Sequence, residues 1–186
     1  MVDITIQEAD HLNGLIGDLL DLANIEAGRL TLQLQPARFE ELVDKAALRV
    51  KLVSEMKEIP VEVIMGSTLP MVKVDLQRMI QVVANLLRVS LKHSPRGSRV
   101  MVNAIERDGY AELRISHGGQ GFSPEKLKGV FTVLKGGNET PEAQDGLRVA
   151  LALAREMVHA HGGEIGVESR GENHGTTFWI RLPKMK

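Results

Sequence analysis

Several features are scarce or missing in this chain of 186 residues, and each absence excludes a class of protein. The sequence contains no cysteine, which excludes disulfides, thiolate catalysis and thiolate metal sites and fits a reducing cytosol. The formal net charge is only -1, so electrostatics give no reason to expect nucleic acid or an anionic membrane as partner. No apolar run approaches the roughly 20 residues of a membrane span, and no signal peptide is recognisable. We therefore expect a cytoplasmic protein without direct membrane contact, or the cytosolic part of a longer, membrane-attached protein.

The residues that are present are ordinary for a soluble globular protein, with 43% hydrophobic and 25% charged. The length fits one domain, or one domain with a short appendage. Residues 3–30 are predicted as one long helix, because apolar residues recur there at spacings of three and four. These residues are Leu12, Leu15, Ile16, Leu19, Leu22 and Ala23. The stripe has no obvious local partner, so it favours an oligomeric bundle, and we expect a homodimer through this helix.

The rest of the chain alternates between short strands and helices. Strands are predicted over 30–35, 59–65, 99–106, 110–117, 164–169 and 176–182, and helices over 39–56, 75–93, 124–131 and 147–161, while 71–74 is a brief apolar run after Pro70. Pro36 is expected to break the first strand, Asp108 with Gly109 is a strong hairpin signal, and Gly162 suits a helix end. This order indicates an α/β (α+β) two-layer sandwich, with helices on one face of a mixed sheet. We expect a helical unit over residues 1–33 and the sandwich domain over 34–186.

The stretch ISHGGQGFS, residues 115–123, raises the question of a nucleotide site. Gly119 and Gly121 follow a short apolar and polar run, and they suit a loop that lets a phosphate-bearing ligand approach the backbone. Such a loop often begins with a carboxylate that reads the base of the ligand, but His117 occupies that position here. The stretch is therefore a nucleotide site, a former one, or merely a turn.

Four segments match one protein family in order and spacing: LIGDLLDLANIEAGRL, DLQRMIQVVANLL, AREMVHAHGGEIGVES and HGTTFWIRLP. Together they resemble the C-terminal half of a sensor histidine kinase, and the resemblance covers nearly the whole chain. It implies the second helix of a dimerisation and phosphotransfer hairpin, followed by the ATP-binding domain shared with gyrase and MutL (the GHKL or Bergerat fold). It also implies ATP and Mg2+ as cofactors of an intact site, and a response regulator or a partner histidine kinase as binding partner.

The N box of this family places two asparagines four residues apart on one helix face. The second asparagine helps to hold Mg2+, and a lysine three residues further meets the phosphates. The frame NLLRVSLK keeps Asn85 and Lys92, but Val89 stands at the second asparagine position. Valine has no oxygen to offer a hard cation that requires oxygen ligands. The next position, tyrosine-like in the family, is His93.

The glycine boxes also depart from the family pattern. The first, D-x-G-x-G, aligns with residues 117–121, so His117 replaces the aspartate that accepts a hydrogen bond from the adenine amino group. Losing a hydrogen bond to a charged group costs on the order of 1.5–3 kcal/mol, or roughly ten- to hundredfold in affinity. The second, G-x-G-x-G at a helix start, keeps only Gly146, and Arg148 is expected to fill space that the phosphates need. The phenylalanine box keeps Phe131 but not its second aromatic residue.

We therefore predict a degenerate ATP pocket, without catalytic residues and without metal ligands. Its members are Asn85, Lys92, His93, His117, Gly119, Gly121, Gly146 and Arg148. The first hypothesis is a pseudokinase that has lost useful Mg-ATP binding and acts through dimerisation and protein contacts. On this hypothesis we expect no cofactor. The second is an active kinase that holds ATP with Asn85, Lys92 and Gly119, phosphorylates an upstream histidine and passes the phosphate to a response regulator. In this atypical pocket, Arg148 would contact a phosphate and His117 would serve as the acceptor. The third is a phosphotransferase that passes phosphate between an upstream histidine and receiver aspartates.

Other candidates carry less weight. The family's phosphoacceptor motif, of the type H-[ED]-x-R/K-x-P, is absent, and His11 lacks the acidic neighbour and the proline of that motif. His159 and His161 resemble a metal pair, yet their spacing straddles a helix end. A basic cluster without interleaved aromatics suggests a solvated rim rather than a nucleic-acid site. It consists of Arg88, Lys92, Arg96 and Arg99. Asp75 fits a helix cap, with Arg78 on the surface of the helix that follows.

Overall fold

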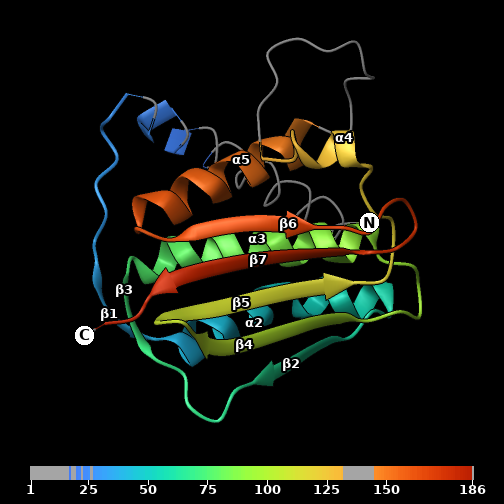
Figure 1. Ribbon diagram of the computed structural model, residues 1–186, viewed down its shortest axis with the longest axis horizontal. Helices are drawn as coiled ribbons and strands as arrows, with labels where there is room; N and C mark the ends of the chain where they lie inside the picture. Colours follow the sequence, from blue (N-terminus) through green and yellow to red (C-terminus); the bar gives the residue numbers. More distant parts are fainter. Residues whose placement is uncertain (1–16, 18–19, 22, 26, 132–144, 186) are drawn as a thin grey trace, which may run out of the picture.

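The computed structural model describes residues 17, 20, 21, 23–25, 27–131 and 145–185, with only the backbone described for 145–148. A five-stranded sheet forms its centre, in the order β2-β4-β5-β7-β6 (Figure 1). The strands are β2 (Val61–Met65), β4 (Val100–Arg107), β5 (Tyr110–His117), β7 (Thr176–Pro183) and β6 (Glu164–Glu168). The helices packed on the sheet are α2 (Phe39–Lys57), α3 (Leu76–His93) and α5 (Asp145–Ala160). The predicted fold class, a mixed sheet layered with helices, is confirmed.

The sheet is mixed because one of its four strand pairs is parallel. β2 runs parallel to β4, whereas β4, β5, β7 and β6 are antiparallel neighbours. The connection from β2 to β4 passes through α3, as a parallel pair requires a long crossover. The β4–β5 hairpin turns at Asp108 (φ 52°) and Gly109 (φ 85°), the left-handed pair of a type I′ turn. The hairpin predicted from this dipeptide is confirmed.

The central helix, α3, packs against both α2 and α5. The Asp75 carboxylate accepts a hydrogen bond from the Arg78 N–H at 3.3 Å, which is the cap predicted from the sequence. Apolar residues at helical spacing then give α3 a broad buried face. Those that are at most 1% exposed are Met79, Ile80, Val83, Ala84, Leu86, Leu87 and Leu91. This packing fixes the last turn of α3, at His93, beside the loop that follows β5.

The first predicted strand requires a correction. Residues 30–34 form no strand, and β1 (Gln35–Arg38) pairs instead with β3 (Met71–Val74) in a separate two-stranded antiparallel sheet. Pro36 lies inside β1, opposite Lys73, rather than breaking a strand. An edge strand tolerates proline because only one of its sides has to supply N–H donors to a neighbour.

The predicted N-terminal helix lies largely outside the described residues, including all of 1–16. Residues 17, 20, 21 and 23–25 are helical. The helix ends before the predicted residue 30, because Gly28 takes a left-handed φ of 64° and its N–H donates to the Ile25 carbonyl at 2.9 Å. The homodimer through this helix, and the division of the chain at residue 33, stay predictions.

Smaller differences concern two later helices. The short helix α4 (Pro124–Leu127) starts at the predicted residue, after a Ser123 side chain that caps it, but gives way to turns before Phe131. α5 begins two residues earlier than predicted and ends before Gly162, whose φ is 71°. None of the helices in the described part of the chain is long and apolar enough to cross a bilayer.

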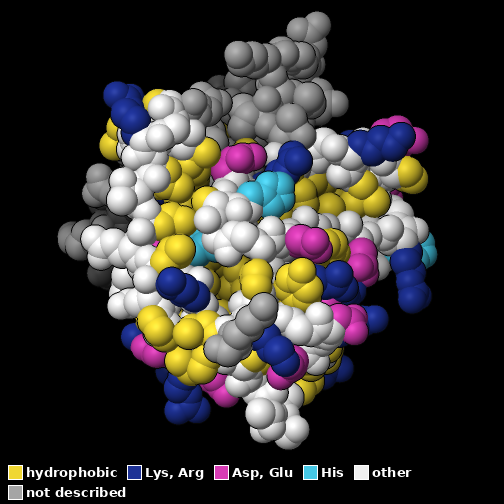
Figure 2. Space-filling model, turned by 60° about the vertical axis from the view of Figure 1, so that its left-hand side comes forward, with side chains coloured by type: hydrophobic (Ala, Val, Ile, Leu, Met, Phe, Trp, Pro, Cys, Tyr) yellow, Lys and Arg dark blue, Asp and Glu magenta, His cyan; other side chains and the backbone are white. Residues whose placement is uncertain are grey.

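The surface carries hydrophobic side chains in several separate patches. Figure 2 shows this for the side of the molecule that lies at the left of Figure 1, where charged side chains separate the patches. The large exposed hydrophobic residues in the described part are Leu20, Leu34, Leu48, Leu52, Met56, Ile64, Met71 and Met185. Leu48, Leu52 and Met56 follow one another at a spacing of four on α2, whereas single exposed hydrophobic residues are normal on a soluble protein.

Candidate functional site

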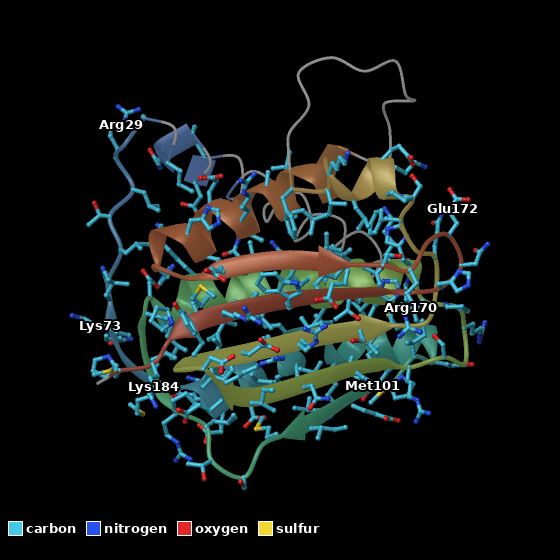
Figure 3. All side chains as sticks on the ribbon, viewed as in Figure 1. Arg29, Lys73, Met101, Arg170, Glu172 and Lys184 are labelled. Carbon is cyan, nitrogen blue, oxygen red and sulfur yellow. The ribbon has the colours of Figure 1, made fainter. Side chains whose placement is uncertain are left out.

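The candidate site lies where the end of β5 meets the end of α3. His117 is the last residue of β5 and His93 is the last residue of α3. The Gln120 N–H donates to the His93 carbonyl at 3.2 Å, which joins the loop after β5 to the helix. The junction lies at the end of the sheet where Figure 3 labels Arg170, on the loop between β6 and β7.

His117 is buried and neutral. Only 5% of it is exposed, and burial, followed by the neighbouring His93, lowers its pKa to about 4. The Gly119 N–H donates to His117 Nδ1 at 3.3 Å, which assigns Nδ1 as the acceptor of the neutral ring and leaves the proton on Nε2. The ring therefore uses its acceptor within the loop, and it has only an N–H to offer a ligand.

His93 is half-buried beside it. Burial is the main cause that lowers the pKa of His93, and Lys92 and Lys57 add to it, whereas a hydrogen bond with the Gln120 side chain opposes it. His93 Nε2 is buried and has no hydrogen-bond partner among the described residues. The junction thus contains two imidazoles that favour the neutral form, and neither supplies the negative charge of a carboxylate.

Gly119 and Gly121 are required by packing within the fold. A Cβ at Gly119 would overlap the His93 carbonyl oxygen, and a Cβ at Gly121 would overlap the Gly171 carbonyl oxygen. The Gly175 N–H donates to the Gly119 carbonyl at 3.0 Å. Both glycines of the predicted phosphate loop therefore face protein backbone at close range.

The N-box positions lie on α3 in different surroundings. Asn85 is half-buried, and its Oδ1 accepts a hydrogen bond from Arg88 Nη1 at 3.0 Å. Val89 is 3% exposed and packs in the hydrophobic core. Lys92 is exposed. The helix thus presents one amide and one ammonium, while an apolar side chain fills the position between them.

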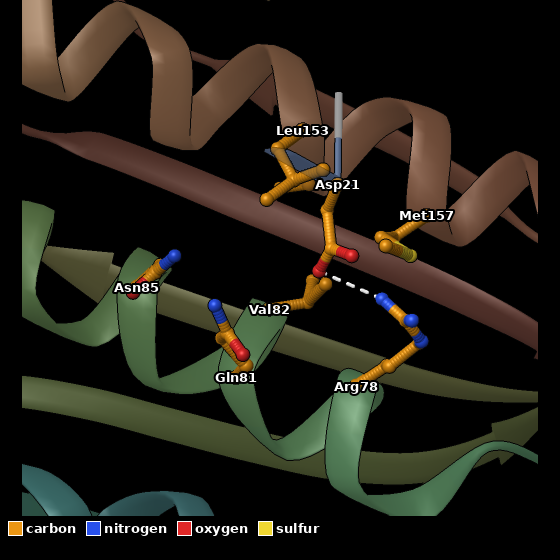
Figure 4. Close-up of a pocket in the computed structure, with 8 residues that line it drawn as sticks. Asp21, Arg78, Gln81, Val82, Asn85, Leu153 and Met157 are labelled. Carbon is orange, nitrogen blue, oxygen red and sulfur yellow. Dashed lines mark ion pairs between the residues drawn. The ribbon is translucent and has the colours of Figure 1, made fainter. Parts of the chain in front are cut away.

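Asn85 also lines a hollow with about 220 Å3 of empty space (Figure 4). The hollow lies between α3, α5 and the N-terminal helical segment, and its residues are Asp21, Arg78, Gln81, Val82, Asn85, Leu153, Ala154 and Met157. This volume includes space that is open to solvent. His93, His117, Gly119 and Gly121 do not line it, so the described part of the chain does not gather the predicted site residues around this hollow.

The second glycine box lies at the start of α5. Gly146 and Arg148 are in the first turn of this helix, and the Arg148 side chain lies outside the described part of the structure. Phe131 is partly buried and packs against the hydrophobic core. Residues 132–144, which include the second aromatic position of the phenylalanine box, lie outside the described residues.

The remaining sequence candidates have local roles. His11 lies outside the described residues. His161 is buried and bonds through both ring nitrogens, to the Asp75 N–H at 3.0 Å and to the Met157 carbonyl at 2.6 Å, whereas His159 is exposed. In the basic cluster, Arg96 pairs with Glu58, Arg99 pairs with Glu62 and Arg88 bonds Asn85. No group of three or more His, Asp or Glu side chains in the described residues is arranged for a metal ion.

A model of the histidine kinase-, DNA gyrase B- and HSP90-like ATPase family matches residues 74–186, which include α3, both glycine boxes and β7. The chain belongs to this family. The resemblance read from the sequence is thereby confirmed, because the chain is similar to the C-terminal region of sensor histidine kinases.

Two kinase relatives match almost the whole chain. The histidine protein kinase DivJ of Caulobacter vibrioides is 32% identical over 177 residues, which are 95% of this chain and 30% of that protein. The sensor protein SrrB of Staphylococcus aureus is 27% identical over 97% of this chain and 31% of its own length. The chain therefore spans about a third of these relatives.

Two solved structures share its fold. The crystal structure of full-length ShkA in complex with AMPPNP has a TM-score of 0.80 at 25% identity, over 97% of this chain and 37% of that one. The histidine kinase AdeS of Acinetobacter baumannii has a TM-score of 0.77 at 20% identity, over 100% of this chain and 84% of that one. The fold of histidine kinase catalytic domains is therefore retained here.

The sequence did not reveal two features of this region. The use of the His117 acceptor by the Gly119 N–H depends on a ring orientation that no motif encodes. The ion pair between Asp21 and Arg78, at 2.7 Å, joins residues 57 positions apart, and Arg78 was expected only as a surface residue of α3. An acidic residue on the exposed flank of the N-terminal stripe is a signal that could have indicated such a pair.

Proposed function

We propose that this chain is a two-component signalling module that has lost useful Mg-ATP binding and acts as a pseudokinase. The observation that carries the proposal is the hydrogen bond from the Gly119 N–H to His117 Nδ1. In the family, the residue at this position accepts a bond from the adenine amino group. Here the acceptor nitrogen is used, and the low pKa of His117 keeps a proton on Nε2 only, so an amino group would meet a second donor.

The magnesium position supports the same proposal. Val89 offers no oxygen and packs in the core at 3% exposure, so the residues present do not fit the family's Mg2+ site. Arg148, in the first turn of α5, stands where the family has glycine. Penalties at separate contacts add, so three changes together weaken Mg-ATP binding far more than any one of them.

The proposed activity is carried by contacts with other proteins. Residues 1–33 would supply half of a helical hairpin for a homodimer, and 34–186 would form a domain that recognises a response regulator or a partner histidine kinase. We place the protein in the cytoplasm, in its own right or as part of a longer, membrane-attached chain. This assignment rests on the family and on the cysteine-free composition.

An active kinase with an atypical pocket is the alternative, and two observations favour it. Asn85 and Lys92 stand at N-box positions of α3. ShkA, at 25% identity, was crystallised with the nucleotide analogue AMPPNP. On this alternative, Arg148 would contact a phosphate and the longer protein would phosphorylate an upstream histidine.

Titration of the protein with Mg-ATP separates the two. Calorimetry and thermal unfolding are expected to show no binding at sub-millimolar ATP. A ligand that binds the folded state raises its stability by RT ln(1 + [L]/Kd), which is about 2.7 kcal/mol at a hundredfold excess over Kd. A stabilisation that follows this relation at sub-millimolar ATP would refute the pseudokinase proposal.

A gain-of-function variant tests the cause. The triple variant His117→Asp, Val89→Asn, Arg148→Gly is expected to restore part of the Mg-ATP binding. His174→Asp is the matched control, since it adds a carboxylate on the exposed loop between β6 and β7 without touching the three positions. A triple variant that folds and still fails to bind would show that the three positions do not explain the loss.

A further inference from the structure

A series of polar contacts joins the N-terminal helical segment to the domain, at the end of α3 opposite His93. Asp21 Oδ2 lies 2.7 Å from Arg78 Nη1 (Figure 4). Arg78 Nε lies 3.6 Å from Asp75 Oδ2, on the residue that caps α3. The Asp75 N–H donates to His161 Nε2 at 3.0 Å, just beyond the last turn of α5. These contacts connect four residues in series, from the N-terminal helical segment through the start of α3 to the end of α5.

This ion pair is better shielded than an ordinary surface pair. The Asp21 side chain is 22% exposed and the Arg78 side chain 28%, compared with 64% and 75% for Glu58 and Arg96. Charges that are partly withdrawn from solvent are screened less by salt than exposed charges, so their attraction holds the two elements that carry them more firmly together. The Asp21–Arg78 pair is therefore suited to fix the helical segment on the domain.

The Asp75 carboxylate also binds the stretch of chain that connects the N-terminal helical segment to the domain. The Gln33 N–H donates to Asp75 Oδ2 at 3.1 Å. Ile25, Leu30 and Leu32 pack against the hydrophobic core from this stretch. Asp75 therefore holds both the guanidinium that binds the segment and the backbone that leads away from it.

His161 supports this arrangement in its neutral form. It is 7% exposed, its Nδ1 bonds the Met157 carbonyl at 2.6 Å, and its Nε2 accepts the Asp75 N–H. Burial is the main cause that lowers the pKa of His161; the Met157 carbonyl and the Asp75 carboxylate raise it, and the charge of Arg78 lowers it. A proton added to Nε2 would face the Asp75 N–H, donor against donor.

We propose that Asp21, Arg78, Asp75 and His161 form a latch that sets the position of the N-terminal helical segment on the domain, and that protonation of His161 opens it. The imidazolium would displace the Asp75 N–H and attract the Asp75 carboxylate away from Arg78 and from the Gln33 N–H. Arg78 would then no longer be oriented toward Asp21, and the segment would detach. This role is independent of ATP binding, so it stands whether or not the proposed function does.

Distance measurement by pulsed electron paramagnetic resonance tests the latch, and the absence of native cysteine allows labels at two chosen sites. Leu20, 61% exposed on the segment, and Asn103, exposed on β4, are changed to cysteine and labelled, with excess unlabelled protein added to suppress distances between chains. At pH 7.5 the unmodified latch is expected to give one narrow distribution. Asp21→Asn and Arg78→Gln are each expected to broaden it, and the double variant no further than either single one.

The pH arm separates the latch from a merely structural role of His161. Lowering the pH stepwise from 7.5 until the imidazole NMR signals of His161 show its protonation is expected to broaden the distribution. His161→Gln keeps an acceptor for the Asp75 N–H, does not titrate, and should stay narrow over the same range. Labels at Asn103 and Lys126, both on the domain, control for unfolding. The proposal is overturned if Asp21→Asn leaves the distance unchanged, or if the protein and its His161→Gln variant respond alike to pH. Asp21 lies outside the domain core, so its variant keeps the test valid even if Arg78→Gln unfolds the domain.

Discussion

Acid is expected to destabilise this protein through His117. The pKa of His117 is about 4 in the folded protein, because the ring is buried beside His93, and about 6.5 in an unfolded chain. A lowered pKa means that the unfolded chain takes up the proton first, so this contribution to stability is complete above pH 6.5 and is lost as the pH falls. At about 1.4 kcal/mol for each pKa unit, His117 contributes a loss of about 2 kcal/mol by pH 5 and about 3 kcal/mol by pH 4.

Urea unfolding followed by the fluorescence of Trp179, the single tryptophan, measures this loss between pH 7.5 and 4.5. His93 and His161 also have lowered pKa values, so they add to the loss and the informative quantity is a difference. In His117→Asn the amide oxygen can accept the Gly119 N–H without titrating, and the pH profile should become shallower by about 2 kcal/mol at pH 5. His159→Asn, on the exposed end of α5, is the control and should keep the original profile. Parallel profiles for the protein and His117→Asn would refute the buried, neutral assignment of His117.

Three further predictions concern the packing around the junction and the sheet. Gly119→Ala places a Cβ against the His93 carbonyl and should lower the free energy of unfolding by about 1–3 kcal/mol. Gly118→Ala is the control and should be close to neutral, because nothing lies within 4 Å of its new Cβ. Equal effects of the two variants in urea titrations would contradict the close approach at Gly119. Gly166→Ala places a Cβ against the Trp179 ring and should both destabilise the protein and shift the emission maximum of that tryptophan, and an unchanged spectrum would argue against the contact. Ser169→Ala removes a hydroxyl that accepts the Phe122 N–H at 3.0 Å and donates to the Gly175 carbonyl at 2.8 Å, so a loss of about 1–3 kcal/mol is expected, and a loss below about 0.5 kcal/mol would mean that water replaces it.

The parts of the fold that were predictable have local causes. The α3 start was readable because the Asp75 side chain bonds a backbone N–H three residues away. The β4–β5 turn was readable because Asp108 and Gly109 take left-handed angles that few other pairs accept. β1 was misplaced because its register is set by β3, more than 30 residues later, and local alternation contains no information on that pairing.

The candidate site divides in the same way. Residue identity alone indicated that Val89 lacks an oxygen and that His117 lacks a carboxylate. It did not indicate which nitrogen of His117 is engaged, because that follows from the path of the loop toward Gly119. Nor did it indicate the partner of Asp21, since the ion pair exists only after the N-terminal segment has packed beside α3.

The close fit of the loop after β5 affects how glycine motifs in such chains should be read. Gly119 lies against the His93 carbonyl and is bonded by the Gly175 N–H, so the folded domain itself needs glycine there. Any variant that loses this glycine is penalised during folding, before a nucleotide is ever encountered. A glycine at this position is therefore explained by the needs of folding alone. The residue at position 117 is the better indicator of whether the domain can still bind an adenine base.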